Sequence, residues 1–208
     1  MKLLKNKVSA IFFITVLVFL FFSCTSSAVS IPSENRRILE NLAVEYYNIA
    51  EAYLEQKNYK KAMEFYDRAM QESSLYQQAY YKKGYAAALA KDWVVAEEIY
   101  RNLVAQDPQN VNIAISLAYV VAQSGKLQEA LEMYSALNES NPYNQLLAED
   151  CIVLYIALEQ FDQAEVAIEK FKVNFPESED VATKLTEQLQ QALSASNQEV
   201  ETQTELVE

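Results

Sequence analysis

A repeat of constant length runs through the middle of the chain and restricts its fold more than any other feature. Pro108, Pro142 and Pro176 are equally spaced. Two further columns keep the same spacing: alanine at 62, 96, 130 and 164, and tyrosine at 66, 100 and 134, followed by isoleucine at 168. Because independent columns agree, the period indicates a stack of equal structural units that pack on their neighbours.

The scarcity of glycine and proline narrows the fold class. The 208 residues include 2 glycines and 4 prolines, whereas an average soluble chain of this length has about 14 and about 10. Gly84 and Gly125 are far apart, so the chain lacks the clustered glycines of a phosphate-binding loop or a dinucleotide fingerprint. A β-sandwich or barrel also needs many Gly/Pro turns. The composition therefore predicts an all-α protein.

Composition also argues against catalysis, metal binding and nucleic-acid binding. The chain has no histidine and 2 cysteines. Ser-His and Cys-His nucleophile pairs are therefore impossible, and two cysteines are too few for a structural zinc site. We expect no enzyme activity, no cofactor and no metal. The net charge of −12 opposes contact with phosphate backbones, so we expect no nucleic-acid partner.

The N-terminus has the pattern of an export signal. Lys2, Lys5 and Lys7 precede an apolar run over 8–22. A basic start followed by a short apolar stretch is typical of a secretory signal peptide, and the run is shorter than the ~20 residues of a membrane span. We predict a signal peptide over 1–24 and a polar spacer over 25–33.

The end of this segment resembles the lipobox of bacterial lipoproteins. Ser23 stands before Cys24, as the small residue does before the cysteine that becomes the lipidated N-terminus, although Phe21 and Phe22 depart from the family pattern. The resemblance implies a lipid on Cys24 and attachment to a membrane on its extracytoplasmic side. Thr25 replaces the aspartate that retains some lipoproteins at the inner membrane, which favours the periplasmic face of the outer membrane. The alternative is an uncleaved N-terminal anchor.

The repeat resembles the tetratricopeptide repeat family, in which a helix-turn-helix recurs with a period of about 34 residues. Four repeats follow without insertions, over 43–76, 77–110, 111–144 and 145–178. The resemblance implies a right-handed superhelical solenoid, with the repeat region spanning 34–178 because its first helix begins early. Regularly spaced apolar residues over 179–194 indicate a C-terminal cap helix. The polar, acidic segment 195–208 predicts a disordered tail.

In this family the first helix of each repeat lines a groove, and its fifth and ninth positions face that groove. In this chain the fifth position holds Tyr47, Tyr81, Ile115 and Glu149. The ninth position holds Glu51, Tyr85, Tyr119 and Val153. The resemblance implies a tyrosine-lined site for a protein or peptide partner, since tyrosine combines a large apolar ring with a polar tip. The alternative is a self-associating structural lipoprotein, a homo-oligomer with no separate peptide ligand.

These observations together predict a membrane-tethered extracytoplasmic scaffold or adaptor. Proteins of similar build serve as accessory parts of envelope assembly, secretion or transport complexes, so the resemblance implies a class of task without naming the partner. Cys151 stands where the family has a core leucine, and we expect a buried thiol there.

Overall fold

The computed structural model describes residues 32–205 and places the side chains of residues 36–198. The predicted signal peptide over 1–24, with Cys24, and the start of the spacer lie outside these residues. The chain divides into two compact units, 1–40 and 41–208. The first contributes only the start of one helix to the described range, and the second contains the repeats.

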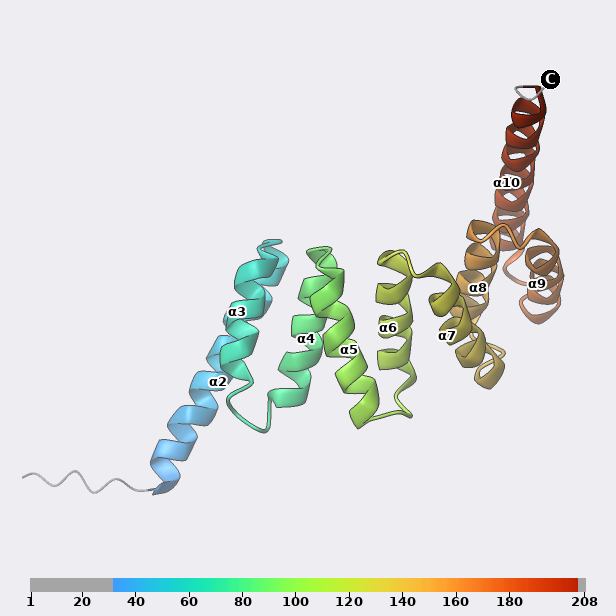
Figure 1. The fold of residues 1–208 in the computed structure, drawn as a ribbon. Coiled ribbons are helices and arrows are strands. Elements are labelled where there is room, and N and C mark those ends of the chain that lie inside the picture. The colour runs from blue at the N-terminus through green and yellow to red at the C-terminus, as the bar shows by residue number, and fades with distance from the viewer. Residues whose placement is uncertain (1–31, 206–208) are drawn as a thin grey trace, which may run out of the picture. The chain divides into compact units, whose positions relative to one another are not determined.

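Nine helices follow one another within residues 32–205, and this range contains no strand (Figure 1). They are α2 (Pro32–Glu55), α3 (Tyr59–Ala69), α4 (Tyr76–Leu89), α5 (Trp93–Gln106), α6 (Val111–Gln123), α7 (Leu127–Ser140), α8 (Gln145–Ala157), α9 (Phe161–Asn174) and α10 (Glu179–Glu205). From α3 onward each helix packs against the next, and α10 also contacts α8. The predicted all-α fold is confirmed. None of the described helices is long and apolar enough to cross a bilayer.

The turn inside each helix pair repeats with the period of the sequence. The only described residues with positive φ are Lys57, Lys91, Gly125 and Glu159, at φ of 58°, 59°, 88° and 57°, and they are equally spaced along the chain. Each lies between the two helices of a repeat, hereafter the A and B helices. Three of the four are not glycine, so these turns hold side chains in a left-handed conformation that costs about 1–2 kcal/mol per residue.

Small side chains bring the A and B helices of each repeat together. Ala62, Ala96, Ala130 and Ala164 are completely buried. Gly84 on α4 makes the closest approach, because a Cβ atom built on it would lie 2.8 Å from Ile99 Cγ2 on α5. The repeated alanines therefore mark the lines along which neighbouring helices meet, as expected where larger side chains would hold the axes apart.

The C-terminal helix differs from the prediction. The sequence predicted a cap helix that ends at 194 and a disordered tail over 195–208, but α10 continues to Glu205. The prediction overlooked that residues 195–205 contain neither glycine nor proline, the residues that most strongly end helices. Leu185 and Leu189 are buried against α8 and α9, as a capping helix requires. At the other end, α2 begins at Pro32, where proline at the first helical position costs no hydrogen bond.

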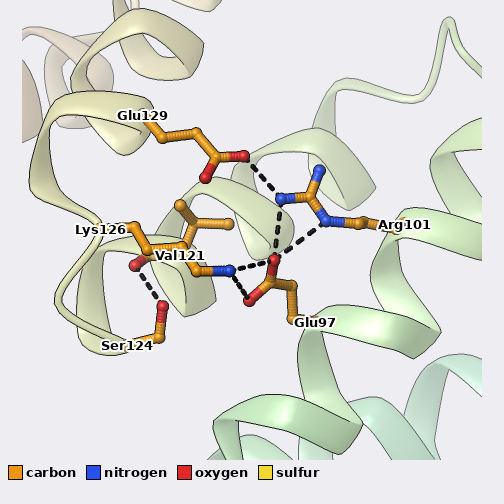
Figure 2. Close-up of polar contacts among 6 residues, drawn as sticks. All are labelled: Glu97, Arg101, Val121, Ser124, Lys126 and Glu129. Atoms are coloured by element: carbon orange, nitrogen blue, oxygen red, sulfur yellow. Dashed lines mark hydrogen bonds and ion pairs between the residues drawn. The ribbon is translucent and has the colours of Figure 1, made fainter.

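An ion-pair network joins the second repeat to the third (Figure 2). The Glu97 carboxylate accepts hydrogen bonds from Arg101 at 2.8 Å and from Lys126 at 2.8 and 2.9 Å. Arg101 also donates to Glu129 at 2.6 Å. The Lys126 and Arg101 hydrogen bonds outweigh burial and lower the pKa of Glu97. This network fixes α5 to the turn between α6 and α7 and to α7 itself.

Candidate protein-binding groove

The predicted site residues lie on one surface, which we call the groove face: the fifth, sixth and ninth positions of the four A helices α2, α4, α6 and α8. The buried tyrosines of the B helices lie beneath this face. Hydrogen bonds join successive A helices across it. Gln78 donates to the Tyr47 hydroxyl at 3.0 Å, and the Tyr81 and Ser116 hydroxyls lie 3.2 Å apart.

The two tyrosines at the fifth position form the floor of the groove face. Tyr47 meets Tyr66 edge to face, with ring centroids 5.6 Å apart and an interplanar angle of 65°. One repeat later, Tyr81 meets Tyr100 with almost the same geometry, at 5.5 Å and 67°. Both fifth-position rings are half-buried. This arrangement favours a structural contribution from Tyr47 and Tyr81, with part of each ring left accessible.

The N-terminal part of the groove face contains an ion pair. Glu51 accepts a hydrogen bond from the buried Tyr66 hydroxyl and pairs with Lys82 at 3.0 Å. Burial lowers the pKa of Lys82, but the hydrogen bond and charge of Glu51 outweigh it and the net shift is upward. Burial and Glu51 both raise the pKa of Tyr66. The carboxylate at this position is thus compensated by a cation and a hydroxyl.

Two of the buried B-helix tyrosines, Tyr100 and Tyr134, have the residue at the sixth position of the next A helix as a polar partner. The Tyr100 hydroxyl hydrogen-bonds Ser116. The Tyr134 hydroxyl hydrogen-bonds the Asp150 carboxylate, which is half-buried. Burial raises the pKa of Asp150, the Tyr134 hydroxyl lowers it, and the charge of Glu149 adds to the net rise. Lys82, Ser116 and Asp150 therefore form one column of the repeat, which changes from cation to hydroxyl to anion.

The ninth position presents large side chains to solvent. Tyr85 is 43% exposed, Tyr119 49% and Val153 46%, on three successive A helices. Each of these exposed fractions exceeds that of a packed core residue, and none of the three side chains takes part in a described ring contact or hydrogen bond. This row is the accessible apolar part of the groove face.

The remaining predicted residues occupy the fifth position of α6 and α8. Ile115 is half-buried beside Tyr81 in a cleft of about 800 Å³ between α4, α5 and α6. Glu149 is half-buried on α8 and accepts a hydrogen bond from Gln145 at 2.7 Å. The eight predicted residues therefore differ in exposure and in bonding.

Three groove-face residues were missed as site residues: Lys82, Ser116 and Asp150. Their signal was present in the sequence, because all three fall at the sixth position and follow the B-helix tyrosines at 66, 100 and 134 at a constant distance. The residues at this position differ in charge between repeats, which is also typical of a solvated surface. Ser116 and Asp150 lie beside the hydroxyl of the preceding tyrosine, whereas Lys82 pairs with Glu51.

Cys151 lies beneath a different surface. It is 4% exposed, as expected for a core thiol, and burial raises its pKa to about 11. It borders a cleft of about 480 Å³ between α7, α8 and α9. Among the described residues, no group of three or more His, Cys, Asp or Glu side chains is arranged to hold a metal ion.

Comparison with protein families gives two matches to tetratricopeptide repeat models, over residues 43–74 and 87–149. An uncharacterized lipoprotein of Treponema pallidum (strain Nichols) is 32% identical over 142 residues, which is 68% of this chain and 72% of that protein.

Solved structures with a similar fold include MamA and YrrB. MamA from Desulfovibrio magneticus RS-1 has a TM-score of 0.58 at 16% identity, over 75% of this chain and 96% of the MamA chain. YrrB, a tetratricopeptide repeat protein with an unusual peptide-binding site, has a TM-score of 0.53 at 17% identity, over 74% of this chain and 92% of its own. At these identities the likeness concerns the fold.

Proposed function

Since this chain belongs to the tetratricopeptide repeat family and is of the lipoprotein type, we propose that it is a membrane-tethered adaptor that binds a protein segment on its groove face. The tetratricopeptide fold suggests a scaffold for protein-protein interaction. The peptide-binding site of YrrB supports a peptide ligand as one mode available to this fold. We place the protein on the extracytoplasmic side of a membrane, at the periplasmic face of the outer membrane, as an accessory part of an envelope assembly, secretion or transport complex.

One observation carries this proposal: the exposed ninth-position row of Tyr85, Tyr119 and Val153. These side chains lie on successive helices and are each more than two-fifths exposed. Exposed aromatic rings held on a rigid floor lose little conformational freedom when a partner covers them, which is why such residues dominate binding energies. In the second repeat, the edge-to-face pair of Tyr81 and Tyr100 supplies such a floor on the helix that holds Tyr85.

Site-directed photo-crosslinking in cells tests the binding surface. We would place a photoreactive amino acid at position 85 or 119, with position 143 as the control. Tyr143 is 81% exposed in the turn between α7 and α8, away from the groove face. We expect crosslinks to a distinct protein from 85 and 119 but not from 143. Crosslinks only to a second copy of this chain would instead support the self-associating alternative, and equal products from all three positions would contradict a binding groove.

The anchor has its own test. We expect Cys24→Ala to prevent lipid attachment, so that the chain is left unprocessed or is released from membranes. Metabolic labelling with a palmitate analogue, followed by membrane fractionation, would report both. Incorporation of label into the Cys24→Ala protein, together with normal cleavage, would refute Cys24 as the lipidated residue while leaving the groove proposal intact.

A further inference from the structure

The charges on the groove face are unevenly distributed along it. Its cation, Lys82, is neutralised by Glu51 at 3.0 Å. At the other end, Glu149 and Asp150 have no lysine or arginine within ion-pair distance among the residues whose side chains are placed. The polar partners that they do have, Gln145 and Tyr134, carry no charge. The fourth repeat therefore presents two carboxylates without a counter-ion.

The repeat does not require a carboxylate at position 150. The equivalent residue one repeat earlier is the neutral Ser116, which lies beside the Tyr100 hydroxyl as Asp150 lies beside the Tyr134 hydroxyl. Asp150 instead keeps a half-buried acid beside Glu149 at a cost in desolvation. A cationic group of a bound partner would offset that cost.

On the basis of the proposed function, we propose that the groove face selects an extended segment with a lysine or arginine at the end that contacts α8 and apolar side chains that contact Tyr119 and Tyr85. Charge complementarity favours a basic segment as the partner. The carboxylates on α8 have no counter-ion among the residues whose side chains are placed, whereas the cation Lys82 is neutralised by Glu51. The whole chain, at net charge −12, would also attract such a segment at long range.

The spacing of the helices sets the spacing of the motif. Neighbouring packed helices lie about 8–10 Å apart, and an extended chain rises about 3.3 Å per residue. The A helices α4, α6 and α8 alternate with B helices in the packing order, so side chains that contact successive A helices should be at least about three residues apart. The expected pattern, in one chain direction or the other, is an apolar residue at Tyr85, a second apolar residue at Tyr119, and a basic residue at Asp150, each separated by at least two residues.

A phage-displayed library of random dodecapeptides, panned on the detergent-solubilised full-length protein, tests this pattern. Selected peptides are then synthesised and their Kd values measured against wild type, Tyr85→Ala/Tyr119→Ala, Glu149→Gln/Asp150→Asn, and a matched control, Glu98→Gln/Glu165→Gln. Glu98 and Glu165 are exposed on the B helices α5 and α9, so the control makes the same change in net charge away from the groove face. Asparagine at position 150 keeps an acceptor for Tyr134.

We expect enrichment of a basic residue at a constant distance of at least three positions from an apolar one. We also expect about tenfold weaker binding to Glu149→Gln/Asp150→Asn at low salt, with no change in the control. Peptides that require Tyr85 and Tyr119 but have no basic enrichment, and that bind both acid variants equally, would overturn this inference and leave the proposed function standing. Selection of no peptide that depends on Tyr85 and Tyr119 would contradict the proposed function itself.

Discussion

Replacing Gly84 with alanine should destabilise the protein, although alanine is the better helix former. A Cβ atom at this position would lie 2.8 Å from Ile99 Cγ2 and 3.3 Å from the Tyr100 ring. Ile99 is 4% exposed and Tyr100 2%, so neither has space to move into. Overpacking a core typically costs about 1–3 kcal/mol, and this contact involves a branched methyl group close to the backbone. The higher helix propensity of alanine offsets about 1 kcal/mol of this cost.

The 2.8 Å contact places the overpacking cost in the upper part of that range, at about 2–3 kcal/mol, so the net loss for Gly84→Ala should be about 1–2 kcal/mol. This lowers Tm by about 2–8 °C in a chain of this size. Urea denaturation followed by circular dichroism measures it. A second change, Ile99→Leu, removes the offending γ2 methyl at nearly constant volume and should recover most of the loss in the double variant. If Gly84→Ala is as stable as wild type, or if Ile99→Leu gives no recovery, close approach of α4 and α5 does not determine the choice of glycine.

Three further predictions concern the turns, the ion-pair network and the core thiol. Gly125→Ala should destabilise the protein by about 1 kcal/mol from backbone strain alone, because the φ of Gly125 is 88° and no atom lies within 4 Å of the added Cβ. Lys91→Gly, at the equivalent turn with φ of 59°, should leave the protein as stable or slightly more stable. Thermal melts of the two variants compare these effects. The pKa of Glu97 is lower in the folded state, so its contribution is present above the unfolded pKa and is lost as pH falls through the folded pKa. Glu97→Gln should cost about 1 kcal/mol at pH 7 and flatten the acid limb of stability against pH, and a parallel acid limb would count against the network. Because burial raises the pKa of Cys151 to about 11 from a reference of 9.0, a thiol reagent at pH 8 should label native protein at least about 100-fold more slowly than unfolded protein.

The fold was predictable because its packing constraints recur. A column such as Ala62 and Ala96 keeps its small size because the same helix contact occurs in every repeat, so the period shows directly in the sequence. The end of α10 was mispredicted for the opposite reason. No repeat pattern marks residues 195–205 in the sequence, and polar composition alone did not distinguish a helix from a disordered tail.

The groove-face positions were named from the sequence, but the exposure and bonding of their side chains were not predicted. Tyr81 and Tyr85 are the same residue type on the same helix, and only the structure separates a half-buried ring packed on Tyr100 from a ring that is 43% exposed. The ion-pair network was not predicted because Glu97 and Lys126 are distant in the sequence. The residues at the Glu97 position in the neighbouring repeats are Met63 and Leu131, so no column revealed it.

In a repeat protein, the residues that determine partner preference are expected at positions whose residue type differs from one repeat to the next. The buried alanines keep their identity because any larger residue would separate the helices. The sixth position changes from Lys82 to Ser116 to Asp150, and each residue is a polar partner of a buried tyrosine hydroxyl or of the carboxylate bound to that hydroxyl. Lys82 is neutralised by Glu51, whereas Asp150 has no counter-ion among the residues whose side chains are placed, so its charge is free to serve the ligand. The groove face therefore has a neutralised cation at its N-terminal end and acids without a counter-ion at its C-terminal end. This difference gives a bound segment a direction that the repeating fold alone does not supply.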